Sequence, residues 1–436
     1  MLSRRRFLGQ AGTVAFVGLA NGVSSNSLAR RGAVPQAAQA NSTDATLLEK
    51  ACTLLRDAPL IDTHNDLPTM LLAAQGELTK YDLGKVQPAL CADIPRLKEG
   101  CVGGQYWSVF VESSTQNTHT SLHEAIREFD VALRLIRSQP DFEQAFTADD
   151  IEHIHKAGHI ACLLGVEGGH MIENSPASLR VFYDLGARYM TLTHWDNIDW
   201  ADSATDRPEH YGLTGFGKQV VREMNRLGMF VDLSHVSADT MRDALSLTRA
   251  PVICSHSSAF AINPHPRNVP DDVLRKIATN GGVVHVNFIK EFISRKNQEW
   301  QDRRTQALHE WHLRADNDGA ITKAMEEWEK NNPFPRPSIS DVADHIDHIR
   351  QVAGIDHVGI GADYYNSGED SMAAGLENVT RYPHLFAELL RRKYSDEDVR
   401  KIAGRNHLRA MRKMEQVAAQ LRKSEPPLLN EGMKGA

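Results

Sequence analysis

The stretch Pro59-Leu60-Ile61-Asp62-Thr63-His64-Asn65-Asp66 runs from an apolar segment directly into side chains that can bind a metal ion. A short apolar run of this kind is typical of a buried strand. Seven more such runs follow, separated by segments of helical periodicity, at 106–111, 160–166, 189–193, 229–233, 251–254, 282–288 and 357–360. Eight strands that alternate with helices predict an α/β fold, in which a parallel sheet closes into a (β/α)8 TIM barrel.

Side chains of metal-ligand type follow six of the eight predicted strands. These side chains are His64 with Asp66, Glu167, His194, His235, His256 and Asp363. The active site of a TIM barrel lies at the carboxyl ends of its strands. We therefore expect one site that gathers these residues, in a barrel of the metal-dependent hydrolase type.

Five of these residues have a pattern that suits two metal ions. His64 and Asp66 are two residues apart, so on an extended chain both point to one side and can reach one ion. His235 and His256 end neighbouring predicted strands and can share a second ion. Glu167 can bridge the two ions with its two oxygens. Imidazole and carboxylate ligands favour zinc, so we expect two Zn²⁺ ions with a bridging hydroxide as the nucleophile.

Two roles stay open for each of three further residues. Asp363 can be the proton shuttle, or a helix cap or partner of a metal-bound histidine. Arg267 can hold a substrate carboxylate, or form a surface ion pair. His194 can hydrogen-bond a developing oxyanion, or serve as a third metal ligand.

The motifs around these residues resemble the membrane dipeptidase family, that is, renal dipeptidase and its bacterial relatives, the M19 peptidases. The matching stretches are LIDTHNDLP (60–68), GGQYWS (103–108), GVEGGH (165–170), YMTLTH (189–194), VDLSHVS (231–237), SHSSA (255–259), RNVPDD (267–272) and HVGIGAD (357–363). The resemblance extends from about residue 48 to about residue 415. Together these motifs are highly specific.

The resemblance implies a zinc-dependent barrel enzyme that cleaves dipeptides, some relatives accepting a D-residue at the C-terminal position and some opening carbapenems. One zinc would be bound by His64 and Asp66 and the other by His235 and His256, with Glu167 bridging. His194 and Arg267 would hold the substrate, and Asp363 would act as acid and base. A homodimer is a further expectation from the family.

One departure concerns the loop after His194. Mammalian members carry a cysteine two residues after the substrate histidine, where this chain has Asp196. The departure puts their disulfides in question and leaves the chemistry intact. Asp196, Asp199 and Asp202 crowd this loop, and we expect them to influence which side chains the site accepts.

Two other functions fit the same pattern less well. Another binuclear amidohydrolase of this barrel type would commonly bridge its metals with a carboxylated lysine, yet Glu167 stands at the strand end where no lysine does. A non-catalytic, secreted peptide-binding protein would be expected to lack a ligand or the proton shuttle, and all are present.

The N-terminus has the features of an export signal. Ser3-Arg4-Arg5-Arg6-Phe7-Leu8 matches the twin-arginine pattern, and Ala38-Gln39-Ala40 offers a cleavage site, with another after Ala29. We expect a signal peptide over 1–40, the dipeptidase barrel over 41–425 and a polar tail over 426–436. The expected location is periplasmic or extracellular.

The composition limits which substrates, partners and cysteine-based sites are expected. The 49 basic and 56 acidic residues give a formal charge of −7 without a basic cluster, so we expect a small peptide substrate and no nucleic acid. Five cysteines without CxxC spacing suggest neither a disulfide framework nor a thiolate zinc site. The N-terminal apolar stretch is too short for a permanent span, so no stable membrane insertion is expected.

The segment from about Lys290 to Pro337 interrupts the alternation after the seventh predicted strand. It is charged, has a helical pattern and contains Trp300, Trp311 and Trp328. We expect an inserted helical segment over or beside the barrel mouth, whose tryptophans serve in packing.

Overall fold

The computed structural model describes residues 36–312, 318–366 and 371–429. By its contacts the chain divides into two units, 1–43 and 44–436. The predicted twin-arginine motif lies outside the described residues, as does most of the polar tail. Within the described part of the chain, no helix is both long and apolar enough to cross a membrane.

Eight parallel strands close into a barrel in the second unit. In chain order they are β1 (Leu60–Asn65), β2 (Val102–Phe110), β4 (Ile160–Glu167), β5 (Ala187–Thr191), β6 (Phe230–Asp232), β7 (Ile253–Cys254), β8 (Val283–Val286) and β9 (Val358–Ile360). Each strand pairs with the next in this order, and β1 pairs with β9 to close the ring. The predicted TIM barrel is confirmed, and each of the eight predicted runs forms a strand.

One short strand was not predicted. β3 (Phe142–Gln144) pairs with the first residues of β4, outside the ring of eight. Of its three residues only Phe142 is buried. A strand with a single buried side chain has no alternating or continuous apolar pattern, so the sequence gives no signal for it.

α1 (Gln36–Asp57) precedes the first strand. Helices follow most of the strands and cover the barrel. They are α2 (Leu67–Ala73), α3 (Ile94–Glu99), α4 (Ser121–Ser138), α5 (Ala148–Lys156), α6 (Pro176–Asp184), α7 (Gly215–Leu227), α8 (Ala238–Leu247), α9 (Asp271–Asn280), α13 (Ile339–Ala353), α14 (Tyr382–Arg391), α15 (Asp396–Arg400) and α16 (Asn406–Ser424). Their start signals are side-chain caps: Ser237 accepts from the backbone N–H of Thr240, and Ser395 forms a capping box with Asp398.

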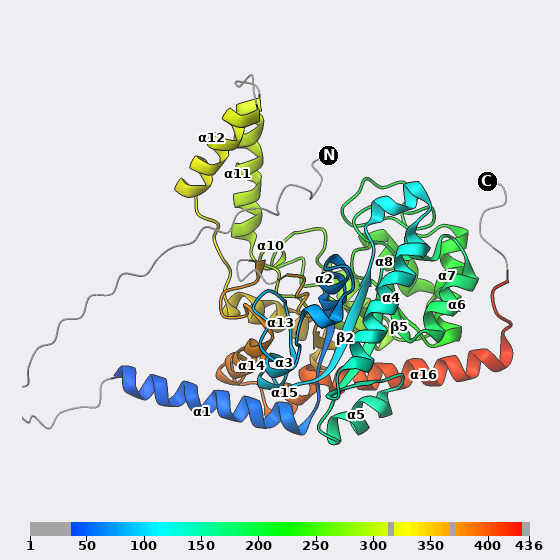
Figure 1. Cartoon of the computed structure of the whole chain (residues 1–436), viewed down its shortest axis with the longest axis horizontal. Helices are drawn as coiled ribbons and strands as arrows, with labels where there is room; N and C mark the ends of the chain where they lie inside the picture. The colour runs from blue at the N-terminus through cyan, green and yellow to red at the C-terminus, as the bar shows by residue number, and fades with distance from the viewer. Residues whose placement is uncertain (1–35, 313–317, 367–370, 430–436) are drawn as a thin grey trace, which may run out of the picture. The chain divides into compact units, whose positions relative to one another are not determined.

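The last helix closes the N-terminal end of the barrel (Figure 1). On α16, Arg409 donates to the carbonyl oxygen of Gly281 just before β8, and Asn406 donates to that of Val358 at the start of β9. Leu408 and Met411 of the same helix belong to the apolar cluster that fills the barrel interior. Because this end is closed, the opposite end, where the strands finish, is free to carry a site.

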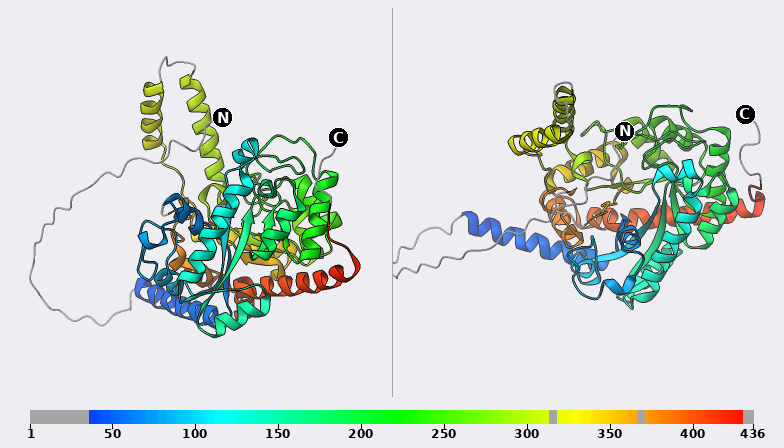
Figure 2. Two further views of the ribbon diagram at one scale, coloured as in Figure 1. Left: turned by 45° about the vertical axis from the view of Figure 1, so that its right-hand side comes forward. Right: turned by 45° about the horizontal axis from the view of Figure 1, so that its top comes forward.

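The insertion after β8 is helical, as predicted. It contains α10 (Lys290–Ile293), α11 (Arg295–His312) and α12 (Asp318–Asn331). Figures 1 and 2 show α11 and α12 as a helical pair that extends away from the barrel. The rings of Trp300 and Trp328 lie 5.4 Å apart, and Trp300 Nε1 donates to the carbonyl oxygen of Asn332. These two tryptophans hold the pair together, which confirms their packing role.

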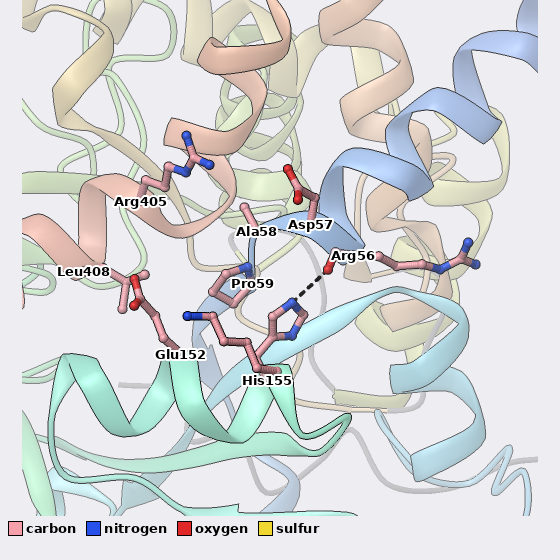
Figure 3. Close-up of a pocket in the computed structure, with 9 residues that line it drawn as sticks. Arg56, Asp57, Ala58, Pro59, Glu152, His155, Arg405 and Leu408 are labelled. Atoms are coloured by element: carbon pink, nitrogen blue, oxygen red, sulfur yellow. Dashed lines mark hydrogen bonds between the residues drawn. The ribbon is translucent and has the colours of Figure 1, made fainter.

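A pocket of about 480 Å³ opens at the closed end of the barrel (Figure 3). Pro59, which precedes β1, contributes to its lining, as do Glu152 of α5 and Arg405 near the start of α16. His155 Nε2 lies 3.0 Å from the carbonyl oxygen of Arg56 across it. The pocket is therefore remote from the strand ends that carry the predicted ligands.

Candidate metal centre

The predicted ligands and their neighbours occupy the carboxyl ends of six strands. His64 lies within β1 and Asp66 directly after it, and Glu167 is the last residue of β4. His194, His235, His256 and Asp363 follow β5, β6, β7 and β9 by two or three residues. Their side chains are buried, from 0% exposure at His64 and His256 to 14% at Asp363. The barrel thus brings all seven residues together, as the sequence predicts.

Glu167 stands at the centre of the cluster. Its Oε1 lies 3.0 Å from His235 Nε2 and 3.5 Å from His256 Nε2. Its Oε2 lies 3.6 Å from His64 Nε2, on the other side. The two oxygens of one carboxylate therefore face two different groups of ligand-type atoms.

The remaining members join one group or the other. On the Oε2 side, His64 Nε2 lies 3.6 Å from Asp66 Oδ1 and 3.9 Å from Asp363 Oδ1. On the Oε1 side, His235 Nε2 and His256 Nε2 are 2.9 Å apart, and His194 Nε2 is 3.5 Å from Glu167. These residues form three overlapping sets, and within each set the ligand atoms lie within 4.8 Å of one another. The sets are His64, Glu167 and His256; Glu167, His194 and His235; and His64, Asp66 and Asp363.

These donors fit divalent cations. Among the described residues, buried His64 Nε2 and Asp66 Oδ1 have no hydrogen-bond partner. Buried polar atoms without a partner are costly unless a ligand satisfies them. His235 Nε2 and His256 Nε2 face each other at a distance that suits two ligands of one ion. The mixed imidazole and carboxylate set is the kind that zinc and related metals bind.

The electrostatics also favour added positive charge beside His64. Burial acts to lower the pKa of His64, but Tyr189, Glu167 and Asp66 outweigh it and hold this pKa well above its ordinary value. By contrast, burial and the charge of Arg267 keep the pKa of both His235 and His256 well below the usual range. Those two imidazoles are neutral and can offer lone pairs to a metal.

Asp363 is a carboxyl group that can hold a proton near neutral pH. Burial, reinforced by the charges of Asp66 and Glu167, raises its pKa to about 8. The pKa of Glu167 moves the other way, because His64 and His194 outweigh its burial. Neighbouring carboxyl groups whose pKa values are pushed apart are typical of acid–base sites.

Arg267 is buried beside the cluster, with 1% of its surface exposed. Its Nη1 and Nη2 donate to Ser257 Oγ and the carbonyl oxygen of His256 at 3.4 and 3.3 Å, and its Nε has no partner among the described residues. Burial lowers the pKa of this guanidinium. The burial rules out the alternative of a surface ion pair.

The profile of the family described as membrane dipeptidase (peptidase family M19) matches residues 48–425. The chain belongs to the membrane dipeptidase family. The predicted resemblance is confirmed, and the enzyme is a metallo-dipeptidase, so the reading as a non-catalytic binding protein is not supported.

Several solved structures share the fold. The probable dipeptidase PvdM from Pseudomonas aeruginosa is 22% identical with a TM-score of 0.75, over 86% of this chain and 100% of that one. A metallopeptidase from Rhodobacter sphaeroides, liganded with a phosphinate mimic of the dipeptide L-Ala-D-Ala, is 24% identical with a TM-score of 0.65, over 82% and 99%. The dipeptidase AC of family M19 is 25% identical with a TM-score of 0.65, over 82% and 98%.

Two buried aspartates that the sequence analysis did not single out tie the ligand-bearing strand ends of this dipeptidase together. Asp62 accepts from the backbone N–H of Ala362 and from the hydroxyl of Tyr382, and so joins β1 to β9 and α14. Asp232 accepts from the N–H groups of Ser234 and Ser255, and so joins the ends of β6 and β7. The sequence signal that could have indicated both residues is an aspartate within a predicted apolar strand, shortly before a ligand-type histidine.

Two ligand-type residues of the dipeptidase have left-handed backbone conformations. His235 has φ of 69° and Asp363 has φ of 66°. Such conformations cost energy for residues other than glycine and gather at functional sites. Both residues stand three positions beyond the ends of their strands, β6 and β9.

The loop after His194 is held by its own aspartates. Asp196 accepts from Ser113 Oγ at 2.5 Å, and Asp199 accepts from the side-chain amide of Asn174. Asp202 accepts from the backbone N–H of His210 at 2.9 Å. These contacts give the acidic residues a role in shaping the loop, while their influence on substrate choice stays a prediction.

A further buried carboxyl near the dipeptidase site went unpredicted. Glu128 of α4 is 1% exposed and accepts from Thr69 Oγ1 at 2.5 Å. Burial, with the charges of Asp66 and Glu167 adding to it, raises its pKa to about 8. A glutamate in an amphipathic helix is ordinarily placed on the solvent face, so the sequence pattern alone could not indicate its burial.

Proposed function

We propose that this dipeptidase hydrolyses the peptide bond of dipeptides, L-D dipeptides among them, with a centre of two zinc ions. The observation that carries the proposal is the position of Glu167, whose two oxygens face separate groups of donors. A carboxylate in this position suits a bridge between two ions.

In this proposal His64 and Asp66 would hold one zinc and His235 and His256 the other, with Glu167 shared between them. Two such ions, when bound, would supply a water-derived nucleophile at neutral pH and polarise the scissile carbonyl. The protein's own contribution is to fix these ligands at the ends of four strands of a rigid barrel.

Arg267 would bind the C-terminal carboxylate of the dipeptide. A buried guanidinium with an unpaired Nε can donate two parallel hydrogen bonds to a carboxylate, which compensates the burial of both charges. A longer peptide has no carboxylate at that position. Binding through Arg267 therefore accounts for a preference for dipeptides.

Asp363 would carry the proton. Its raised pKa allows the carboxyl to take a proton from the attacking water and deliver it to the leaving amine nitrogen. His194 would hydrogen-bond the oxyanion that develops on the carbonyl oxygen. Its ring is held between Phe110, at 4.8 Å, and His235, at 4.4 Å between centroids.

The alternative role of His194, as a third metal ligand, makes a different prediction. A His194→Ala variant that keeps both ions but loses activity supports the substrate role. A variant that loses an ion supports ligation, to which the 3.5 Å separation from Glu167 is also suited.

We further propose that residues 1–40 are a twin-arginine signal that delivers the folded enzyme to the periplasm or the exterior, as a homodimer. Changing Arg4 and Arg5 to lysine should retain the precursor in the cytoplasm. N-terminal sequencing of the exported form would locate the cut, and sedimentation would give its oligomeric state.

The activity itself is tested by removing the metals, restoring zinc and assaying L-L and L-D dipeptides beside N-acetylated and C-amidated controls. We expect zinc-dependent cleavage that fails on the C-amidated control. Cleavage of dipeptides without metal would refute the two-zinc mechanism, and no cleavage with two zinc ions bound would leave an amidohydrolase of another substrate class.

A further inference from the structure

The phenol of Tyr189 lies in the barrel interior against the metal centre. Tyr189 belongs to β5 and is 0% exposed. Its Oη lies 2.9 Å from His64 Nδ1 and 3.0 Å from the carbonyl oxygen of Thr63. The imidazole thus has the tyrosine on one nitrogen, while its other nitrogen points to Glu167 and Asp66.

The chemistry of these two contacts fixes which nitrogen of His64 carries the proton. A carbonyl oxygen can only accept, so the single hydroxyl proton of Tyr189 goes to Thr63. The phenol oxygen is then left with lone pairs, and the contact with His64 requires a proton on Nδ1. In the neutral imidazole, which is the form that binds a metal ion, Nε2 is then the unprotonated nitrogen, and it lies on the side of the carboxylates.

The strand next to β5 makes room for this ring. Gly165 of β4 is the register partner of Tyr189. A Cβ at position 165 would lie 1.9 Å from Tyr189 Cζ and 2.4 Å from its Oη. Only glycine leaves the space that the phenol occupies, and this glycine stands two residues before Glu167.

We propose that Tyr189 is a positioning residue, which holds His64 in the tautomer and orientation that bind a metal ion. The inference rests on the proposed function, since it takes His64 as a ligand. Partners of this kind raise metal affinity, and their loss typically weakens binding about 10- to 100-fold.

The effect should fall on one ion only. His256 Nδ1 has a different partner, Ser255 Oγ at 2.7 Å. His235 Nδ1 has none among the described residues. Tyr189 contacts a ligand on the Oε2 side of Glu167, so its loss should weaken that site and spare the other. A general loss of stability would not separate the two sites in this way.

The test compares Tyr189→Phe with a matched control, Tyr106→Phe. Tyr106 is also 0% exposed in the barrel interior, but its hydroxyl lies 2.9 Å from His407 Nε2 and contacts no candidate ligand. Each metal-free protein is titrated with zinc against a competing chelator to give two dissociation constants. We expect Tyr189→Phe to weaken one site about 10- to 100-fold and Tyr106→Phe to change neither. Two unchanged constants for Tyr189→Phe, or equal losses in both variants, would overturn the inference.

A His64→Ala variant separates this inference from the proposed function. If it retains two tight zinc ions, His64 is not a ligand and the proposed centre fails. If it loses one ion while Tyr189→Phe binds zinc as the parent does, only the positioning role fails.

A second measurement uses the parent enzyme and needs no Tyr189 variant. Proton NMR of the zinc-loaded form should show an imidazole Nδ1–H resonance that disappears in His64→Ala. The absence of this resonance from the parent would refute the assignment.

Discussion

Replacing Gly361 by alanine should disable the metal centre, although Gly361 is not itself one of the ligand-type residues. Gly361 follows β9 and stands two residues before Asp363. A Cβ there would lie 1.8 Å from the carbonyl oxygen of Ser255 and 2.7 Å from Thr63 Oγ1. Thr63 Oγ1 already donates to that carbonyl at 2.5 Å. Three segments that carry site residues therefore meet at this glycine.

The size of the effect follows from the overlap. Real Cβ contacts stay above 3.0 Å, so the segments must separate by 3.0 − 1.8 = 1.2 Å. The obstacle is backbone and cannot rotate away. The displacement passes to His256, which follows Ser255, and to Asp363. A shift of about 1 Å in a catalytic group can cost roughly 100-fold in rate, and overpacking costs about 1–3 kcal/mol in stability.

The assay is kcat/KM on a dipeptide, with the zinc content and thermal unfolding of the same preparation. Gly215→Ala is the matched control, because Gly215 is the first residue of α7 and a Cβ there meets nothing within 4 Å. The control should be neutral or more stable by about 0.5–1 kcal/mol. A Gly361→Ala enzyme with the parent's kcat/KM and zinc content would refute the reasoning.

Three further outcomes are expected. Arg267→Met should lower kcat/KM on a free dipeptide roughly 30- to 4,000-fold, which corresponds to about 2–5 kcal/mol of lost transition-state stabilisation, while its zinc content stays that of the parent; the parent's kcat/KM in this variant would contradict the carboxylate role. The free energy of unfolding of Glu128→Gln should increase relative to that of the parent as pH rises from about 4.5 to about 8. The reason is that the folded parent protein keeps a proton on Glu128 that its unfolded chain releases above about 4.5, so the parent loses stability over this range. Urea unfolding at both ends of that range measures this, and a pH-independent difference would exclude the raised pKa of Glu128. Chelation should lower the melting temperature, since an ion at a thousand times its Kd stabilises the fold by about 4 kcal/mol; an unchanged melting temperature after complete metal removal would argue against a preformed site.

The barrel and the gathering of ligand-type residues at one end of it could be predicted because both depend on short-range pattern. Each buried strand is a short apolar run, and each ligand-type residue lies at or just after the end of a strand, on the same side of the barrel. The outward-facing β3 has only Phe142 buried, so no pattern marks it.

The supporting residues could not be predicted because their partners are distant in sequence. Asp62 looks like a possible ligand until Ala362 and Tyr382 are placed beside it. Tyr189 looks like an ordinary apolar strand residue until His64 lies against its hydroxyl. Arg267 is a charged loop residue whose burial depends on the whole barrel mouth.

The closure of the barrel by its last strand and helix has a consequence for the order of events during synthesis. Asp62 accepts its hydrogen bond from a residue 300 positions later. At about 5–20 residues per second, a ribosome takes roughly 15–60 s to cover that length. During this time β2, the first neighbour of β1, has been synthesised, but β9, its last neighbour, has not. Some of the residues that surround His64 in the folded barrel are therefore still missing. The ring can close only when nearly all of the chain has left the ribosome, so metal loading has to be a late, post-translational event.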